Sequence, residues 1–277
     1  MFKTLIVDTT CKEKLFCLSD VLSKHDYEQI FYISVDKQFQ QFDIFKEIHN
    51  YKVHDVNIIK EDFKNNKKYH GESAWGDGVY DDVLLEHAKL EIIKMHKSGK
   101  NFNFTIINTD THHPYGHSPR CSVGNTSAEI EKIYWAYRCT SGFVKKFFDD
   151  LDNVGVLDDT VVVIMGDHTA YGAMVDLKSR SERDIYFKMN TDKEFKRSKM
   201  NHYDVAPTIL DEMGFLPDDN KHYGFGVSLF EDQNKFNYDS HYEIVMNKDI
   251  LSAFYMRRLL EFSPKPSGFV FKKKYLD

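Results

Sequence analysis

Short apolar runs that stop at polar residues stand out along this chain. Residues 160–165 form a β-branched run that ends at Gly166, and residues 104–107 form a second apolar run that ends at Asn108. Continuous apolar runs of this length are typical of strands that are buried on both faces. The pattern predicts strands at 104–107 and 160–165, the second of them buried and parallel.

Helical periodicity is clearest in two longer segments. Residues 83–96 repeat apolar positions three and four apart and are followed by Gly99, which suits a helix end. The side chains expected to face inward are Leu84, Leu85, Ala88, Ile92 and Met95. Residues 127–151 predict a longer helix. Its expected apolar stripe contains Ile130, Ile133, Tyr134, Tyr137 and Phe147.

Shorter elements complete an alternating order of strands and helices. We expect strands at residues 4–7, 29–35 and 185–189, and a helix at 18–24. A further helix is expected within 201–215, with Asp204 as its N-cap and Gly214 at its end. Residues 39–68 show no clear periodicity. This alternation favours a layered α/β domain.

Chemically interesting residues follow the two strongest strand predictions. Asp167 and His168 come directly after the strand at 160–165, where open α/β sheets place their ligands. A carboxylate beside an imidazole is half of a site for Zn²⁺ or Mn²⁺. The alternative is a polar turn in which Asp167 only caps the next helix.

A pair of histidines follows the strand at 104–107. His112 and His113 precede Pro114, which disfavours helix at His113 and keeps the segment extended or turned. Two imidazoles in a loop at a strand end, beside the carboxylate of Asp110, suit the binding of an anion or a metal.

The order and spacing of these motifs resemble the catalytic half of the alkaline phosphatase/sulfatase superfamily. Within it, the chain is most similar to phosphoglycerol transferases and lipoteichoic acid synthases, over about residues 11–230. The matching segments are residues 17–22 (CLSDVL), 75–76 (WG), 80–85 (YDDVLL), 109–115 (TDTHHPY), 166–168 (GDH) and the pair Cys121 and Cys139. The resemblance implies a three-layer α/β sandwich with a central, mostly parallel sheet.

The resemblance also implies an activity and a set of site residues. A Thr or Ser hydroxyl would attack phosphorus and form a covalent phospho-enzyme, from which a second alcohol or water takes the group. Asp167 and His168 would hold a divalent metal, Mn or Zn and less favourably Mg. His112, His113 and Arg120 would bind the substrate, with Arg120 on an anionic head group. The implied donor is an anionic phospholipid or another phosphoglycerol donor, and the acceptor is a glycan.

The nucleophile is the weak point of this resemblance. Relatives carry it upstream of the CLSD segment, together with an acidic metal ligand on the first strand. Here Asp8 is the only acid before Cys11, and Thr9 and Thr10 are the candidate nucleophiles. Either this motif is compressed into residues 4–11 or it is missing, in which case the chain is a truncated and inactive form. We expect it to be missing.

Composition limits the partners and the domain count. The 277 residues are 42% hydrophobic and carry a formal net charge of −6, so no basic surface for nucleic acid is expected. We expect residues 1–233 to form one sulfatase-like domain with a truncated N-terminal portion, and residues 234–277 to form an extension packed on it. No run is apolar enough for a transmembrane segment.

The sequence leaves two alternatives for localisation. The family acts in the periplasm or at the cell envelope, whereas no signal peptide follows Met1, so a cytoplasmic or truncated protein is the alternative. Cys11 with Cys17, and Cys121 with Cys139, either form small-loop disulfides or are reduced thiols.

Three hypotheses about function follow. The first is a metal-dependent phosphoglycerol transferase acting on a glycan. The second is a hydrolase of phosphate or sulfate esters, although the C/S-x-P-x-R motif of a conventional sulfatase is absent from the sequence. The third is a degenerate module that binds without turnover. Metal content separates the third from the others, and the reaction product separates the first two.

Overall fold

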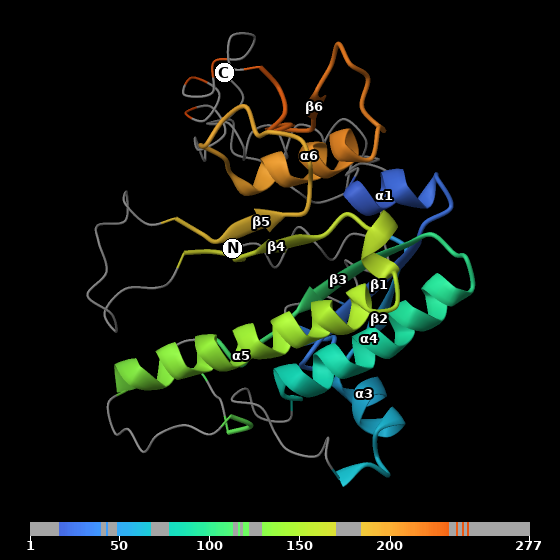
Figure 1. Cartoon of the computed structure of the whole chain (residues 1–277), viewed down its shortest axis with the longest axis vertical. Coiled ribbons are helices and arrows are strands. Elements are labelled where there is room, and N and C mark those ends of the chain that lie inside the picture. Colours follow the sequence, from blue (N-terminus) through green and yellow to red (C-terminus); the bar gives the residue numbers. More distant parts are fainter. Residues whose placement is uncertain are drawn as a thin grey trace, which may run out of the picture. The chain divides into compact units, whose positions relative to one another are not determined.

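A computed structural model describes residues 17–39, 43, 49–67, 78–112, 116, 119–121, 129–169, 184–232, 237, 240 and 243 (Figure 1). The chain folds into two compact units. The first, Ser19–Asn190, is called the sheet unit; the second, Met1–Leu18 with Thr191–Asp277, is called the C-terminal unit. The strand expected at residues 4–7 and almost all of the extension at 234–277 lie outside the described residues.

Three parallel strands form the centre of the sheet unit. They are β1 (Glu28–Ile33), β2 (Tyr51–His54) and β3 (Phe102–Ile107), in the order β2-β1-β3. Ile30 and Tyr32 of β1 belong to one apolar cluster, whereas Phe31 and Ile33 belong to another. Because neighbouring side chains of a strand point to opposite faces, both faces of β1 are covered, as a continuous apolar run requires.

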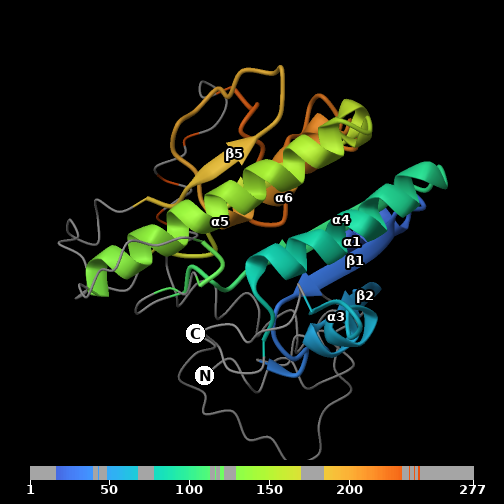
Figure 2. The same ribbon diagram turned by 60° about the horizontal axis from the view of Figure 1, so that its bottom comes forward.

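Two long helices accompany this sheet. In Figures 1 and 2, α4 (Asp81–Lys97) and α5 (Glu129–Asp152) run side by side, and α4 contacts β1 and β3. The helix predicted at 83–96 is therefore confirmed, and Gly99 follows its end with a φ of 68°. All of its predicted inward residues are buried: Leu84, Leu85, Ala88, Ile92 and Met95.

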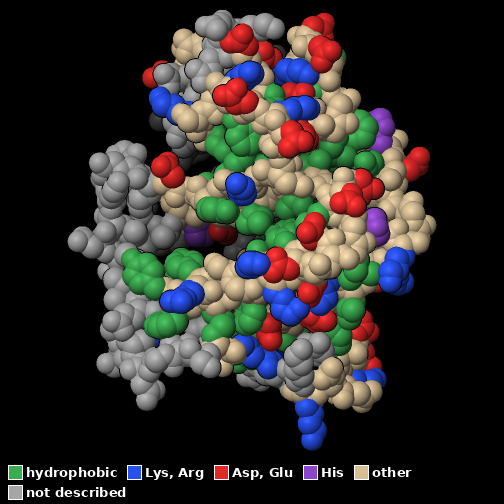
Figure 3. All heavy atoms as spheres, in the orientation of Figure 1, with side chains coloured by type: hydrophobic (Ala, Val, Ile, Leu, Met, Phe, Trp, Pro, Cys, Tyr) green, Lys and Arg blue, Asp and Glu red, His purple; other side chains and the backbone are tan. Residues whose placement is uncertain are grey.

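The apolar stripe predicted for α5 is only partly correct. Ile133 and Phe147 are buried, but Tyr134 and Tyr137 are 55% and 45% exposed. Hydrophobic side chains are accordingly visible on the outer side of α5 (Figure 3). Successive helical residues point about 100° apart, so a buried line through Ile133 and Ala136 turns Tyr134 and Tyr137 outward.

The strand predicted at 160–165 differs from expectation. The observed strand β4 (Val163–Met165) is short and half-buried, and it pairs antiparallel with β5 (Phe187–Met189). A 3₁₀ turn, η4 (Val156–Asp159), precedes it. The Asn190 side chain accepts a hydrogen bond from Val162 N and donates one to Thr160 O, which fixes the start of β4 beside the end of β5. The prediction of a buried parallel strand here was wrong, and the strand predicted at 185–189 is confirmed.

Two elements lie within residues 39–68, where the sequence shows no clear periodicity. They are β2 and the helix α3 (Val56–Asp62), which follows it directly. Asp55 is the N-cap of α3, because its carboxylate accepts hydrogen bonds from the backbone N–H groups of Asn57 and Ile58. Both elements are too short for periodicity to reveal. The helix predicted at 18–24 is confirmed as α1 (Leu18–Ser23).

The C-terminal unit contains a short helix and a hairpin. After the 3₁₀ turn η6 (His202–Asp204) come α6 (Val205–Glu212) and the antiparallel strands β6 (His222–Tyr223) and β7 (Gly226–Val227). The predicted helix end at Gly214, with a φ of 75°, is confirmed.

Asp204 occupies the N-cap position of that helix, as predicted, but without the expected capping hydrogen bond. Asp204 makes no side-chain cap for α6; instead Asn201 caps η6 by accepting a hydrogen bond from Tyr203 N. The Asp204 side chain turns inward, where it accepts hydrogen bonds from Asn201 N and Val227 N and lies 3.3 Å from Arg197 Nη2. Asp204 is therefore a buried link between η6 and β7.

Backbone packing between η6 and β7 is unusually close. A Cβ atom placed on Gly226 would lie 1.7 Å from the carbonyl oxygen of Tyr203. Only a residue without a side chain fits there. Across the described residues, no helix is long and apolar enough to cross a membrane.

Candidate functional site at the ends of β3 and β4

Asp167 and His168 lie directly after β4, as the sequence predicts, and both are exposed. His168 Nδ1 lies 2.9 Å from the carbonyl oxygen of Thr169. A carbonyl oxygen only accepts hydrogen bonds, so Nδ1 carries the proton and, in the neutral ring, Nε2 presents its lone pair. His168 is thus held in the tautomer that binds a metal through Nε2.

The two side chains also face each other at a distance that suits a shared cation. His168 Nε2 lies 3.4 Å from Asp167 Oδ2. Two ligand atoms on a tetrahedral cation, each about 2.0–2.2 Å from it, lie roughly 3.4 Å apart. Without a cation, the lone pair and the carboxylate repel each other unless the ring is protonated. The residues present therefore fit one edge of a Zn²⁺ or Mn²⁺ site.

A hydrogen-bond network fixes the loop after β3. Asp81, the first residue of α4, is fully buried, and its Oδ1 accepts hydrogen bonds from the backbone N–H groups of Thr109 and Asp110. Its Oδ2 accepts hydrogen bonds from Asn108 Nδ2 and Thr140 Oγ1 at 2.9 and 2.8 Å. Asp81 therefore holds the β3 loop against both α4 and α5.

The Asp110 side chain in turn binds the backbone of Asp81. Its Oδ2 accepts a hydrogen bond from the backbone N–H of Asp81 at 2.9 Å, and Asp110 is only 3% exposed. Burial, and secondarily the nearby Asp81 carboxylate, raise the pKa of Asp110 to about 8. Its Oδ1 has no hydrogen-bond partner in the described structure. A carboxyl group in this setting holds its proton at neutral pH.

His112 lies two residues beyond Asp110, in the segment that this network holds. Its backbone N–H donates to Thr109 O, and its carbonyl accepts from Gly116 N. Gly116, with a φ of 62°, leaves no room for a Cβ, which would lie 2.5 Å from Ala136 Cβ of α5. The backbone around His112 is therefore fixed on both sides.

Arg120 has neighbours of its own at the start of α4. Its Nε lies 3.7 Å from Asp82 Oδ1, and its guanidinium lies 4.8 Å from the centre of the Tyr80 ring. The side chain is 22% exposed, so an anion reaching it meets a guanidinium that is already held in place.

A disulfide anchors the segment that carries Arg120. Cys121 is bonded to Cys139 of α5, with the two Cα atoms 5.9 Å apart. This answers the question that the sequence left open for this pair. Cys11 lies outside the described residues, as do Asp8, Thr9, Thr10 and His113.

The sequence did not predict that Asp81 and Asp110 belong to one hydrogen-bond network. Asp110 was noted only as a neighbour of the histidines, and Asp81 only as part of a matching segment. Acidic residues in a helical first turn usually signal an exposed cap. Nothing local to either residue indicates that they pair 29 positions apart.

The sulfatase family profile matches residues 11–215, which is most of the chain. This chain belongs to the sulfatase family. The match contains β1 to β5, the Asp167–His168 pair and the β3 loop, and its extent agrees with the resemblance inferred from the motifs.

Curated relatives of this chain include phosphoglycerol transferases. The chain is 26% identical over 227 residues to phosphoglycerol transferase I of Shigella flexneri, and equally to that of Escherichia coli strain SMS-3-5 / SECEC. Each alignment covers 79% of this chain but only 29% of the relative. The chain thus spans less than a third of the length of these relatives.

Solved structures agree on the fold. The lipoteichoic acid synthase LtaP from Listeria monocytogenes superposes with a TM-score of 0.62 and 18% identity, covering 80% of this chain and 58% of that one. A protein of the alkaline phosphatase superfamily from Vibrio parahaemolyticus gives a TM-score of 0.59 at 20% identity, covering 76% and 50%. The fold is the α/β architecture of the alkaline phosphatase superfamily, as predicted.

Proposed function

We propose that this sulfatase-family chain is the catalytic part of a metal-dependent phosphoglycerol transferase. The observation that carries the proposal is the Asp167–His168 pair, whose oxygen and nitrogen face each other at 3.4 Å in the tautomer suited to a metal. The similarity to phosphoglycerol transferase I supports phosphoglycerol as the transferred group. A bound Mn²⁺ or Zn²⁺, or less favourably Mg²⁺, lowers the pKa of a hydroxyl nucleophile and offsets charge on phosphoryl oxygens.

The proposed reaction takes the alternative in which the nucleophile motif is compressed into residues 4–11, and it transfers a head group in two balanced steps. A threonine hydroxyl, Thr9 or Thr10, forms an O–P bond to the phosphoglycerol group of an anionic phospholipid, while the P–O bond to the lipid alcohol breaks. The proton lost by the threonine ends on the lipid alcohol. A glycan hydroxyl then takes the group and restores the threonine.

The remaining residues bind and orient the substrate. His112 and His113 donate hydrogen bonds to phosphoryl oxygens, and Arg120, held by Asp82 and Tyr80, pairs with the anionic head group. Asp8 completes the metal ligands with Asp167 and His168. We further propose that residues 1–233 act as one catalytic domain, with 234–277 packed on it, and that the protein works at the cell envelope, as its relatives do.

Metal content tests the basis of this function. The purified full chain is expected to hold about one equivalent of Mn or Zn by elemental mass spectrometry, and Asp167→Ala to lose it. Asp149→Ala is the matched control, because Asp149 is also an exposed carboxylate and its partner is Lys145, on the surface of α5. A folded wild-type chain without metal, after addition of Mn²⁺ and Zn²⁺, would refute the proposal.

The product identifies the reaction. Wild-type chain, incubated with vesicles of phosphatidylglycerol and a glucose oligomer, should form a phosphodiester on the sugar, and His168→Ala should abolish it. Release of free glycerol phosphate without a sugar product would instead identify a hydrolase. A phosphorylated peptide containing Thr9 or Thr10, found by mass spectrometry in a reaction without acceptor, would locate the nucleophile.

A further inference from the structure

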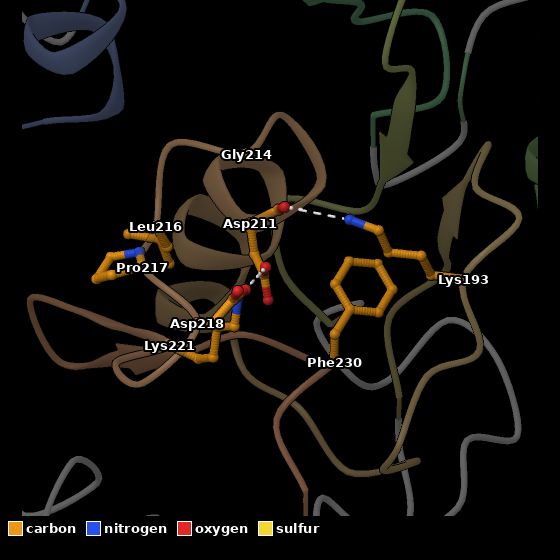
Figure 4. Close-up of a pocket in the computed structure, with 8 residues that line it drawn as sticks. All are labelled: Lys193, Asp211, Gly214, Leu216, Pro217, Asp218, Lys221 and Phe230. Carbon is orange, nitrogen blue, oxygen red and sulfur yellow. Dashed lines mark hydrogen bonds and ion pairs between the residues drawn. The ribbon is translucent and has the colours of Figure 1, made fainter.

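A cavity in the C-terminal unit is lined by charges that neutralise one another. It has a volume of about 520 Å³ and opens beside the end of α6 (Figure 4). Lys221 Nζ lies 2.7 Å from Asp211 Oδ1 and 3.4 Å from Asp218 Oδ1. Lys193 Nζ lies 3.2 Å from Glu212 Oε2. Both lysines of the described wall are therefore paired with carboxylates, and the cavity presents neither of them to a ligand.

Two exposed tyrosines of the sheet unit lie beside the candidate site. Tyr134 and Tyr137 of α5 are 55% and 45% exposed. They are three positions apart in a helix, so their side chains project from the same side of α5. Each ring ends in a hydroxyl group that can donate and accept hydrogen bonds. A ligand that approaches this side of α5 can reach both side chains.

The turn of α5 that carries Tyr137 is fixed to the loop after β3. A Cβ atom on Gly116 of this loop would lie 2.5 Å from Ala136 Cβ, so the two backbones pack closely at Ala136. One turn further on, Thr140 Oγ1 donates a hydrogen bond to Asp81 Oδ2 at 2.8 Å. Tyr137 directly follows Ala136 and is exposed at the edge of this contact.

Tyr137 is also close to the carboxylate of the Asp167–His168 pair. Burial, then Tyr134, and then the Asp167 carboxylate raise the pKa of Tyr137. Charges act on one another only over short distances in a salt solution, so the last of these influences places the carboxylate near the phenol. No hydrogen bond is among these influences. Within the described residues, the Tyr137 hydroxyl is therefore left for a ligand.

We infer that Tyr137 is a substrate-binding residue of the proposed transferase, and that its hydroxyl donates a hydrogen bond to a phosphoryl oxygen of the group bound at Asp167 and His168. This inference rests on the proposed function. Donors placed around phosphoryl oxygens stabilise their negative charge. His112 supplies one donor from the β3 loop and Tyr137 supplies another from α5, so the group is held from two elements.

NMR of the full chain, labelled with ¹³C at the tyrosine Cζ atoms, tests this contact. The resonance that is absent from the spectrum of Tyr137→Phe belongs to Tyr137. Addition of glycerol phosphate to the Zn²⁺-loaded wild type should shift this resonance in a saturable manner, because Cζ carries the hydroxyl. In a calorimetric titration, Tyr137→Phe should bind glycerol phosphate about tenfold more weakly than wild type, since it lacks one hydrogen bond to a charged group.

The matched control is Tyr27→Phe, which also removes one phenol hydroxyl. Tyr27 directly precedes β1, and because β1 and β3 are parallel, it lies at the edge of the sheet opposite the β3 loop. This variant should bind glycerol phosphate within about twofold of wild type.

Metal content separates this inference from the proposed function. Tyr137→Phe should retain the metal of wild type, because its phenol binds the substrate and not the metal. A folded wild-type chain that takes up no metal would overturn both the proposed function and the role of Tyr137. In a metal-loaded wild type, three results would overturn the role of Tyr137 alone: no saturable binding of glycerol phosphate, a Tyr137 resonance that does not shift, or equal affinity in Tyr137→Phe.

Discussion

Asp110 is a carboxyl group held protonated by its surroundings. Its pKa is raised from 3.8 to about 8, first by burial and then by the Asp81 carboxylate, with Asp82 adding to the rise and Arg120 opposing it. Between these two pH values the folded chain binds a proton that the unfolded chain releases. The free energy of unfolding therefore falls as pH rises from about 4 to about 8, and this contribution is flat above that window.

Asp110→Asn should remove that pH dependence. The amide keeps an oxygen for the Asp81 N–H and cannot ionise, so the variant gains stability relative to wild type by about 1.4 kcal/mol per pH unit through the window. Urea unfolding of both proteins at pH 5, 6, 7 and 8 measures this difference. A difference that stays constant from pH 5 to 8 would contradict a protonated Asp110.

His54 provides the opposite case. It is buried, neither ring nitrogen has a hydrogen-bond partner in the described structure, and its ring stacks on Tyr32 with centroids 4.7 Å apart. Burial, with Lys52 and His87 nearby, lowers the pKa of His54 from 6.5 to about 4. Folding therefore expels a proton between pH 4 and 6.5, and stability from this group is lost as pH falls through that range.

His54→Phe should accordingly protect the chain against mild acid. Phenylalanine retains the stack on Tyr32 and has no charged form, so the variant should gain about 1 kcal/mol or more over wild type at pH 5. At pH 8 the two proteins should differ little. Thermal melts at the two pH values, with exposed His222→Phe as the control, test the prediction. Equal acid sensitivity of His54→Phe and wild type would count against it.

Among the elements, the 3₁₀ turn η6 depends on a cap, Asn201, that the sequence did not predict. Asn201 and Asp204 bond each other's backbone N–H groups in a capping box. Asn201→Ala should cost about 1 kcal/mol of stability, because Tyr203 N loses its acceptor. Asn201→Asp should cost much less, since the carboxylate can accept the same hydrogen bond. Chemical denaturation of the two variants separates the outcomes, and equal losses would exclude the cap.

Helices and strands were predictable where features within the segment itself determine its structure. The helix α4 shows this, because its period, its buried face and the glycine after it are all local features. The strand β4 shows the limit, since its pairing with β5 depends on Asn190, which lies beyond a long connecting segment. The position of Asp204 at the start of α6 was predictable, but the partners of its side chain were not, because Arg197 and Val227 are tertiary contacts.

At the scale of the whole molecule, the disulfide fixes a surface segment to a long helix. The bond between Cys121 and Cys139 closes a loop with a separation of 18 residues. In the chain-entropy account such a loop stabilises the fold by about 3 kcal/mol. Cys121→Ser with Cys139→Ser should lower stability by that amount, and reducing agent should affect wild type alone. Unchanged melting of wild type in reducing agent would contradict this role.

The candidate site was predictable as a set of motifs but not as an arrangement. Asp167, His168 and His112 follow strands, as their positions in the sequence indicate. The network of Asp81, which holds the His112 loop against α5, joins residues up to 59 positions apart and carries no local signal. Asp8, Thr9, Thr10 and His113 lie outside the described residues and stay predictions.

The approach of β7 to η6 has a consequence for how this chain tolerates variation. Every amino acid other than glycine at position 226 would place an atom inside the van der Waals radius of the Tyr203 carbonyl. In a saturation library selected for soluble, folded protein, position 226 should retain only glycine codons. Codon diversity should survive at Gly224, where a φ of 61° disfavours side chains but the space is open. Position 226 is limited by the space for a side chain, whereas position 224 is limited by its backbone torsion angle. The selected library should therefore show less diversity at 226 than at 224.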